Sequence, residues 1–152
     1  MSTTGVLAHL DLSVGDPDAS IPFYAALLEE IGFTRWSSEE PGWTGDKPRR
    51  AAWFIRNADG SLFFTDLRPS QPEKRDRKYD RYAPGPHHVA FHAASREVVE
   101  RVYDRVSAAG GTVLDAPAEY SGPAYGGGYY AVFFADPDGV KLEVVHHPPT
   151  NP

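Results

Sequence analysis

Apolar and polar side chains alternate over a short stretch near the start of the chain, and the spacing then becomes helical. Leu10, Leu12 and Val14 occupy every second position, which predicts a half-buried strand with one apolar face. Residues 16–18 (Asp-Pro-Asp) follow with capping carboxylates and a proline suited to a first helical turn, and apolar residues then recur at helical spacing until Gly32. The pattern therefore predicts a strand followed by a helix.

The rest of the first half predicts three short strands, and the second half repeats the whole order. Tight turns are predicted at 57–60 and 136–139, where Asp and Gly stand between apolar runs, so each turn joins the last two strands of its half in a hairpin. In the second half Ser95 is the expected helix cap, and the helix ends at 110–111. The expected strands are 34–37, 51–56 and 61–67 in the first half and 88–93, 113–114, 129–135 and 140–146 in the second.

The two halves also share identical residues. A shift that carries His9 onto His88, 79 residues further on, superposes several other identical pairs. Such a repeat predicts two related βαβββ modules, at about 5–67 and 85–147, joined by a charged linker at about 68–84. The predicted fold class is α+β, a single domain whose two modules form a cupped mixed sheet with the helices on its outer face. The further pairs are Tyr24 and Tyr103, Gly32 and Gly111, Phe54 and Phe133, Asp59 and Asp138, and Gly60 and Gly139.

Composition narrows the class of protein. With no cysteine, the chain has no disulfides, thiol nucleophiles or thiolate metal sites. The net charge of −6 gives no support for a nucleic-acid partner. The apolar stretches are too short to span a membrane and no secretory signal is visible, so we expect a cytoplasmic protein without a membrane partner. Aromatic residues make up 12% of the chain, which suits an aromatic-lined pocket for a small molecule.

The candidates for chemistry are polar residues on the strand faces opposite the apolar side chains. His9 and His88 are related by the repeat, and Glu143 alternates with the apolar Leu142 and Val144. Two histidines and one carboxylate form a set that binds divalent transition metals and leaves coordination positions open. We therefore predict a divalent ion (Fe, Mn, Zn or Ni) on His9, His88 and Glu143, where it would polarise a bound oxygen.

Other residues bear on this ligand set. His87 is expected to point to the face opposite its neighbour, because strand side chains alternate, and His92 lies about 13 Å further along the strand. The repeat counterpart of Glu143 is Phe64, which argues against a symmetric fourth ligand. Asp66 lies two residues further along the same face and would become a fourth ligand only through a bulge or a register shift.

Three motifs carry a family resemblance: HLDLSVGD with FYAALLEEIGF near the start, HHVAFHA in the middle, and YYAVFFADPDGVKLEVVH near the end. They resemble the vicinal oxygen chelate superfamily, which includes glyoxalase I, bleomycin-resistance proteins, fosfomycin-resistance enzymes and extradiol dioxygenases. The resemblance implies paired βαβββ modules and metal ligands where His9, His88 and Glu143 stand. It also implies a small substrate that is chelated through vicinal oxygens and stabilised as an enolate or alkoxide. The chain is most similar to glyoxalase-like bacterial members.

Departures from the subfamilies leave the reaction open. Glyoxalase I uses four ligands, whereas Phe64 stands at the fourth position here. Extradiol dioxygenases carry a tyrosine ten residues before the glutamate, where this chain has Phe133. Bleomycin-resistance proteins lack the metal ligands. Isomerisation, epoxide opening and oxygen insertion all remain possible reactions.

Further residues are expected around the metal. Glu143, Tyr130 and His92 are the catalytic candidates, as metal ligand or acid–base groups. The glycine- and tyrosine-rich loop 121–130 is a candidate lid over a planar ligand, and Trp36 and Trp43 are further candidates for the pocket wall. The expected substrate-pocket residues are Phe64, Asp66, Tyr125, Tyr129 and Trp53.

Two functions from different classes follow. The first is a metal-dependent small-molecule enzyme of the glyoxalase or dioxygenase type. The second is a non-catalytic binding protein that sequesters an aromatic antibiotic or metabolite, with the histidines and the glutamate as polar ligand contacts. A homodimer is expected for either, because small open sheets leave edges to cover.

Overall fold

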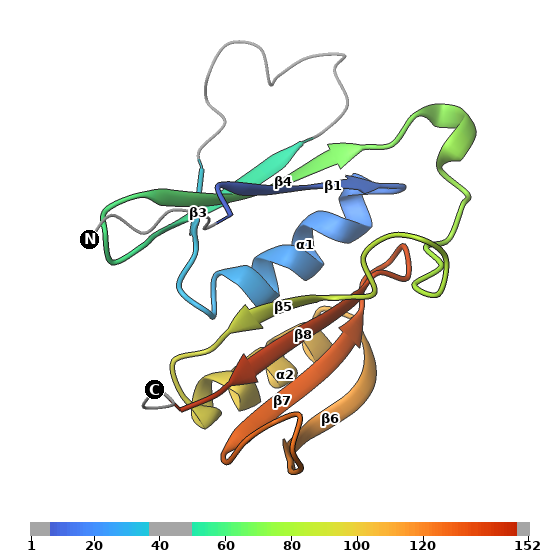
Figure 1. Cartoon of the computed structure of the whole chain (residues 1–152). Coiled ribbons are helices and arrows are strands. Elements are labelled where there is room, and N and C mark those ends of the chain that lie inside the picture. The colour runs from blue at the N-terminus through green and yellow to red at the C-terminus, as the bar shows by residue number, and fades with distance from the viewer. Residues whose placement is uncertain (1–6, 37–49, 149–152) are drawn as a thin grey trace. The chain divides into compact units, whose positions relative to one another are not determined.

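The protein consists of two compact units, Met1–Arg77 and Lys78–Pro152. They are described from a computed structural model, which places residues 7–36 and 50–148. Each unit contains a strand, a helix and three further strands in that order, so the predicted α+β class and the two βαβββ modules are confirmed (Figure 1).

The first unit is a four-stranded mixed sheet with one helix. Its strands lie in the order β1-β4-β3-β2, with β1 parallel to β4 and the other neighbours antiparallel. A short 3-10 helix, Pro72–Lys74, follows the last strand. The elements are β1 (His9–Val14), α1 (Pro17–Leu28), β2 (Thr34–Arg35), β3 (Ala51–Arg56) and β4 (Leu62–Pro69).

Helix α1 has the predicted start and packs on one face of this sheet. The Asp16 carboxylate accepts a hydrogen bond from the backbone N–H of Asp18 at 2.9 Å, and Pro17 occupies the first turn. The chain leaves the helix through Gly32, whose φ of 97° suits glycine. Leu27 of the helix and Trp53 of β3 are fully buried, and they belong to the core between helix and sheet.

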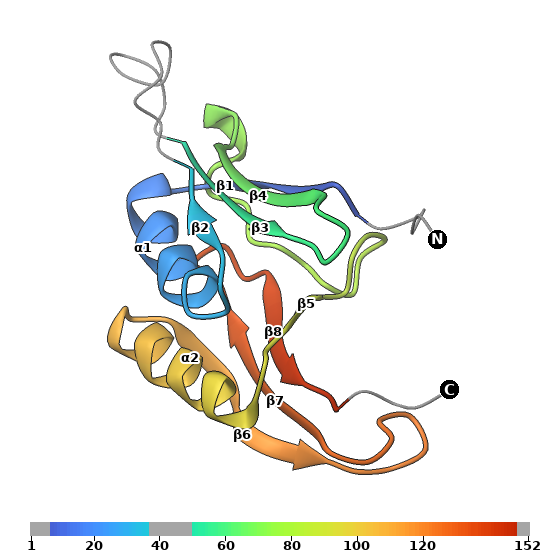
Figure 2. The ribbon, with the colours of Figure 1, turned by 90° about the vertical axis from the view of Figure 1, so that its left-hand side faces the viewer.

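The second unit repeats this arrangement. Its strand order is β5-β8-β7-β6, and again only the first strand is parallel to its neighbour. The Ser95 side chain caps α2 as predicted, and three valines of α2 are buried. The helix packs against β6, β7 and β8 of this sheet (Figure 2). The elements are β5 (Val89–His92), α2 (Arg96–Ala108), β6 (Thr112–Tyr120), β7 (Tyr129–Ala135) and β8 (Lys141–His146).

Two elements differ from the sequence expectation. Strand β6 runs over nine residues instead of two, with register shifts on both sides of Asp115. Pro117 lies in the second shift, where its missing N–H interrupts the ladder. The predicted linker is also partly built into the units. Strand β4 continues to Pro69, and the backbone N–H of Tyr79 donates to the Asp138 carbonyl at 2.9 Å, in the turn between β7 and β8.

Candidate functional site

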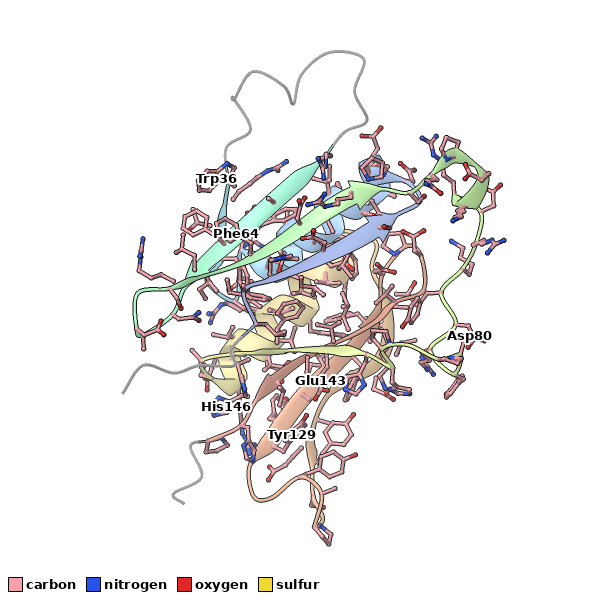
Figure 3. The ribbon with its side chains drawn as sticks, turned by 45° about the horizontal axis from the view of Figure 1, so that its top comes forward. Trp36, Phe64, Asp80, Tyr129, Glu143 and His146 are labelled. Atoms are coloured by element: carbon pink, nitrogen blue, oxygen red, sulfur yellow. The ribbon has the colours of Figure 1, made fainter. Side chains whose placement is uncertain are left out.

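A histidine, a carboxylate and a tyrosine from three segments meet in the second unit. His88 Nε2 lies 3.1 Å from Glu143 Oε2, while the Tyr129 hydroxyl donates to Glu143 Oε1. The Glu143 side chain is 3% exposed and that of His88 is 36% exposed. Figure 3 shows Tyr129 and Glu143 as neighbours on this sheet. A buried carboxylate is thus held on both oxygens, with an imidazole on its open side.

His87 joins the same cluster, contrary to expectation. Its Nδ1 lies 2.8 Å from Nδ1 of His88, so the two rings do not point to opposite faces. The alternation rule fails because β5 begins only at Val89, and both histidines precede the strand. One Nδ1 donates and the other accepts, which leaves His88 Nε2 directed at Glu143.

The consecutive residues Tyr129 and Tyr130 lie on opposite faces of the sheet. Tyr129 faces Glu143, and burial and the bond to Glu143 both raise its phenol pKa, so the hydroxyl keeps its proton and donates. Tyr130 lies on the other face of the sheet, where its hydroxyl donates to Glu100 of α2 and Arg96 stacks on its ring. Tyr130 is therefore not placed to serve as the acid–base group predicted from the sequence.

Aromatic rings extend the surface beside Glu143. The rings of Tyr125 and Tyr129 lie 5.2 Å apart between centroids, and Tyr120 contacts both. Phe133 packs against Tyr120 and carries the Lys141 ammonium 4.3 Å from its ring centroid. Tyr125 remains 39% exposed. The predicted pocket residues Tyr125 and Tyr129 therefore belong to one half-exposed aromatic cluster.

The first unit carries a cavity of about 310 Å³ on the sheet face opposite α1. Its wall joins aromatic and charged side chains, and it includes the predicted metal ligand His9 and both Phe64 and Asp66. Figure 3 shows Trp36 and Phe64 close together on this face. The lining residues are His9, Asp11, Trp36, Ala52, Phe64, Asp66 and Arg68.

Arg68 is the electrostatic centre of this cavity. Its Nη2 lies 2.9 Å from Asp11 Oδ2 and 3.2 Å from Asp66 Oδ2, so one guanidinium group serves two carboxylates. Asp11 also contacts His9, with 3.3 Å between Oδ1 and Nδ1. The sequence could have indicated Asp11, because residues two positions apart on a strand share a face and Asp11 lies two residues beyond His9. Arg68 was missed because its position was assigned to the linker.

Burial opposes ionisation of Asp66. It raises the pKa of this carboxyl, and the nearby positive charges of Arg68 and Arg50 only partly offset the effect. Oδ1 of Asp66 is buried without a hydrogen-bond partner among the described residues. A raised folded-state pKa means that the Asp66 contribution to stability is present at low pH and is lost as the pH rises through that pKa.

We therefore expect Asp66→Asn to change how stability depends on pH. The variant should be more stable relative to the wild type at pH 7 than at pH 4. At pH 7 the wild type bears the cost of ionising Asp66 in the cavity, whereas asparagine does not ionise. Urea unfolding followed by circular dichroism at both pH values measures this difference. If the stability of the variant relative to the wild type were the same at both pH values, or lower at pH 7, the raised pKa of Asp66 would be contradicted.

The remaining predicted residues occupy different surroundings. Trp53 is fully buried on the helix side, where its indole N–H donates to Glu29 at 3.1 Å, so it is a core residue and not part of the pocket. His92 is exposed and shares the sheet face of Glu143, as the pairs Ala90–Glu143 and His92–Val145 show. Trp43 lies outside the described residues.

Strand pairing revises the repeat relation between the two histidines. The hairpins of the two units match at the expected shift, because Phe54 pairs with Phe64 and Phe133 pairs with Glu143. In the first unit His9 lies beside Phe64, but in the second unit Ala90 lies beside Glu143. The first strands therefore differ by two residues in register. A shift of two keeps His88 on the same face, but it removes its structural equivalence to His9.

Among the described residues, neither unit alone brings together three histidine or acidic side chains in an arrangement that could hold a metal ion. The predicted set draws His9 from the first unit and His88 and Glu143 from the second. No helix in the described part of the chain is long and apolar enough to cross a membrane.

Comparison with known proteins agrees with this fold. The sequence profile of the Glyoxalase/Bleomycin resistance protein/Dioxygenase superfamily matches residues 6–144. The uncharacterised protein YqjT of Bacillus subtilis is 32% identical over 138 residues, which cover 90% of this chain and 95% of YqjT. The chain therefore belongs to the glyoxalase/bleomycin resistance protein/dioxygenase superfamily.

Solved structures show the same fold. A candidate glyoxalase from Bacillus halodurans matches with a TM-score of 0.70 and 28% identity, covering 95% of this chain and 97% of its own. A glyoxalase/bleomycin resistance protein/dioxygenase domain from Frankia sp. EAN1pec matches with a TM-score of 0.62 and 20% identity, over 95% and 98% of the two chains. Members of this superfamily bind small molecules and commonly use divalent metals.

Proposed function

We propose that the protein is a metal-dependent small-molecule enzyme of the glyoxalase or dioxygenase type, with His9, His88 and Glu143 as metal ligands. The observation that carries the proposal is the approach of His88 Nε2 to Glu143 Oε2 at 3.1 Å. Two ligand atoms that each lie about 2.0–2.2 Å from the same ion are about 3 Å apart when they are neighbours in its coordination shell, so this separation is compatible with a shared divalent metal.

The donor set fits Fe(II), Mn(II), Zn(II) or Ni(II), because two imidazoles and one carboxylate leave the ion a residual positive charge. When bound, such an ion supplies Lewis acidity toward the vicinal oxygens of a substrate. His9 is more than half exposed, with 64% of its side chain accessible, and it lines the cavity of the first unit. It is thus available as the third donor.

The neighbours of the two ligands in the second unit have positioning roles in this proposal. Tyr129 holds one oxygen of Glu143 and leaves the other toward His88. His87 Nδ1 lies 2.8 Å from His88 Nδ1. In the metal-bound form that we propose, His88 Nδ1–H donates to His87, and the Nε2 lone pair of His88 binds the metal. His92, exposed on the face of Glu143, is the remaining acid–base candidate.

Removing the Tyr129 hydroxyl tests the positioning role. We expect Tyr129→Phe to weaken Mn(II) or Zn(II) binding by about 10- to 100-fold, because residues that orient a metal ligand commonly have this effect. Tyr130→Phe is the matched control on the other face of the sheet, and it should leave the affinity unchanged. Isothermal titration calorimetry gives both values. Equal affinities in the two variants would show that Tyr129 does not position Glu143.

The competing function is a binding protein without turnover. The aromatic cluster around Tyr125 and Tyr129 favours it, since such a surface holds a planar ligand without a metal. The discriminating experiment compares ligand affinity and turnover before and after chelation, in the wild type and in His88→Ala. Loss of both metal and turnover in His88→Ala supports the enzyme. Ligand binding that survives chelation and the substitution, without turnover, supports the binding protein.

A homodimer remains part of the proposal. Within the described part of each unit, the edge strands of the four-stranded sheet have one neighbour each, and exposed edges favour pairing with another chain. These edge strands are β1 and β2 in the first unit and β5 and β6 in the second. Light scattering coupled to size-exclusion chromatography measures the mass in solution. A mass of one chain at micromolar concentration would contradict the proposal.

A further inference from the structure

Three rows of side chains cross the cavity face of the first unit. Phe54 and Phe64 are paired in one row, Asp66 and Ala52 in the next, and Arg68 stands in the third. Successive rows along a strand are about 7 Å apart, because same-face residues alternate. The face therefore changes from aromatic through acidic to basic across a short distance.

Ala52 leaves a gap in the middle row. Trp36 is hydrogen-bonded beside it, with its backbone N–H 2.9 Å from the Ala52 carbonyl. The Trp36 ring contacts Phe54 and Phe64, each at 5.8 Å between centroids. The small Ala52 side chain therefore forms the floor of the cavity. On one side lie the rings of Trp36, Phe54 and Phe64, and on the other lies the Asp66 carboxylate. The cavity of about 310 Å³ is at the small end of ligand pockets, which suits a single substituted ring.

The polar edge of the cavity is formed by two carboxylates and the cations paired with them. Asp11 and Asp66 both contact Arg68, and Arg50 Nη2 lies 3.9 Å from Asp66 Oδ2. An incoming carboxylate would meet two negative charges and two cations that are already paired with them. A hydroxyl or amino group would instead donate a hydrogen bond to the part of the Asp66 carboxylate that lines the cavity, where 13% of the side chain stays exposed.

We propose that this cavity binds a planar aromatic ring bearing a hydroxyl or amino group on one edge. The ring lies over Ala52 against Trp36 and Phe64, and the donor points to the carboxylate of Asp66. As a statement about the substrate class, this inference rests on the proposed function, because His9 lines the same cavity. Ring binding itself is testable without metal.

The test uses the full chain in EDTA and two matched probes, 4-methylphenol and 4-methylanisole, which differ only by the methyl group that removes the donor. Saturation-transfer NMR titrations give both affinities, and the indole N–H signal of Trp36, assigned through Trp36→Phe, reports the location. We expect 4-methylphenol to shift that signal and to bind about tenfold more tightly than the ether, as for a hydrogen bond to a charged acceptor.

Substitution at the floor of the cavity tests the location. Ala52→Leu should weaken 4-methylphenol binding at least about tenfold, because the new side chain fills the gap over which the ring lies. Ala19→Leu makes the same change on the exposed face of α1 and should have no effect. If Ala52→Leu does not fold by circular dichroism, Trp36→Ala replaces it, since Trp36 is 46% exposed and its loss leaves the core intact.

Three results would overturn the inference: equal affinity for the phenol and the ether, no shift of the Trp36 signal, or unchanged phenol binding when the gap is filled. A separate Zn(II) titration distinguishes this failure from failure of the proposed function. Metal binding without phenol binding rejects the inference alone, whereas phenol binding without metal binding supports the inference and rejects the metal site.

Discussion

Replacing Trp53 by alanine should lower the free energy of unfolding by about 3–5 kcal/mol. Trp53 is fully buried, and its indole N–H donates to Glu29 just beyond the end of α1, so the substitution leaves a cavity between β3 and the helix. Part of the cost is the lost apolar burial and part is the unfilled volume. Urea unfolding followed by circular dichroism measures the change.

Trp36 provides a matched control for this prediction. Its side chain is 46% exposed at the end of β2, so Trp36→Ala should cost about 1 kcal/mol or less. From the sequence, Trp53 was expected in the pocket and Trp36 was a further candidate for its wall, whereas the structure places Trp53 in the core and Trp36 at the cavity. Similar losses of stability in the two variants would contradict that assignment.

The second large effect is expected at Glu143. Glu143→Gln retains the shape of the side chain but removes the negative charge, and we expect divalent metal affinity to fall at least about 100-fold. Calorimetric titration of Mn(II) and Zn(II) at pH 7 gives the affinities. Glu119→Gln on β6 is the control, because Glu119 is an exposed carboxylate that forms an ion pair with Arg96. Equal affinity of Glu143→Gln and the wild type would remove Glu143 from the ligand set.

The hairpins explain why much of the fold was predictable. The turn at 136–139 fixes the register of β7 on β8, since Asp136 accepts hydrogen bonds from the backbone N–H groups of Asp138 and Val140. That register pairs Phe133 with Glu143, and alternation then places Tyr129 on the same face. The information needed to choose Tyr129 instead of Tyr130 was therefore present in the sequence.

Other features depend on long-range contacts that the sequence does not specify. No tight turn connects β5 to β8, so no local sequence motif fixes the register of this parallel pair. The sequence therefore could not show that this register differs by two residues from that of β1 on β4. Strand β3 is apolar on both faces, which left the orientation of Trp53 undetermined. The meeting of His87 with His88 depends on where β5 begins, and strand ends are the least certain part of any such prediction.

The central proposal is that His9, His88 and Glu143 bind one divalent metal ion. Elemental mass spectrometry of protein purified without added metal or chelator, in the wild type, His9→Ala and His92→Ala, tests it most directly. The account predicts about one Fe, Mn, Zn or Ni per chain in the wild type and in His92→Ala, and almost none in His9→Ala. Full metal content in His9→Ala, or none in the wild type even after reconstitution, would contradict it.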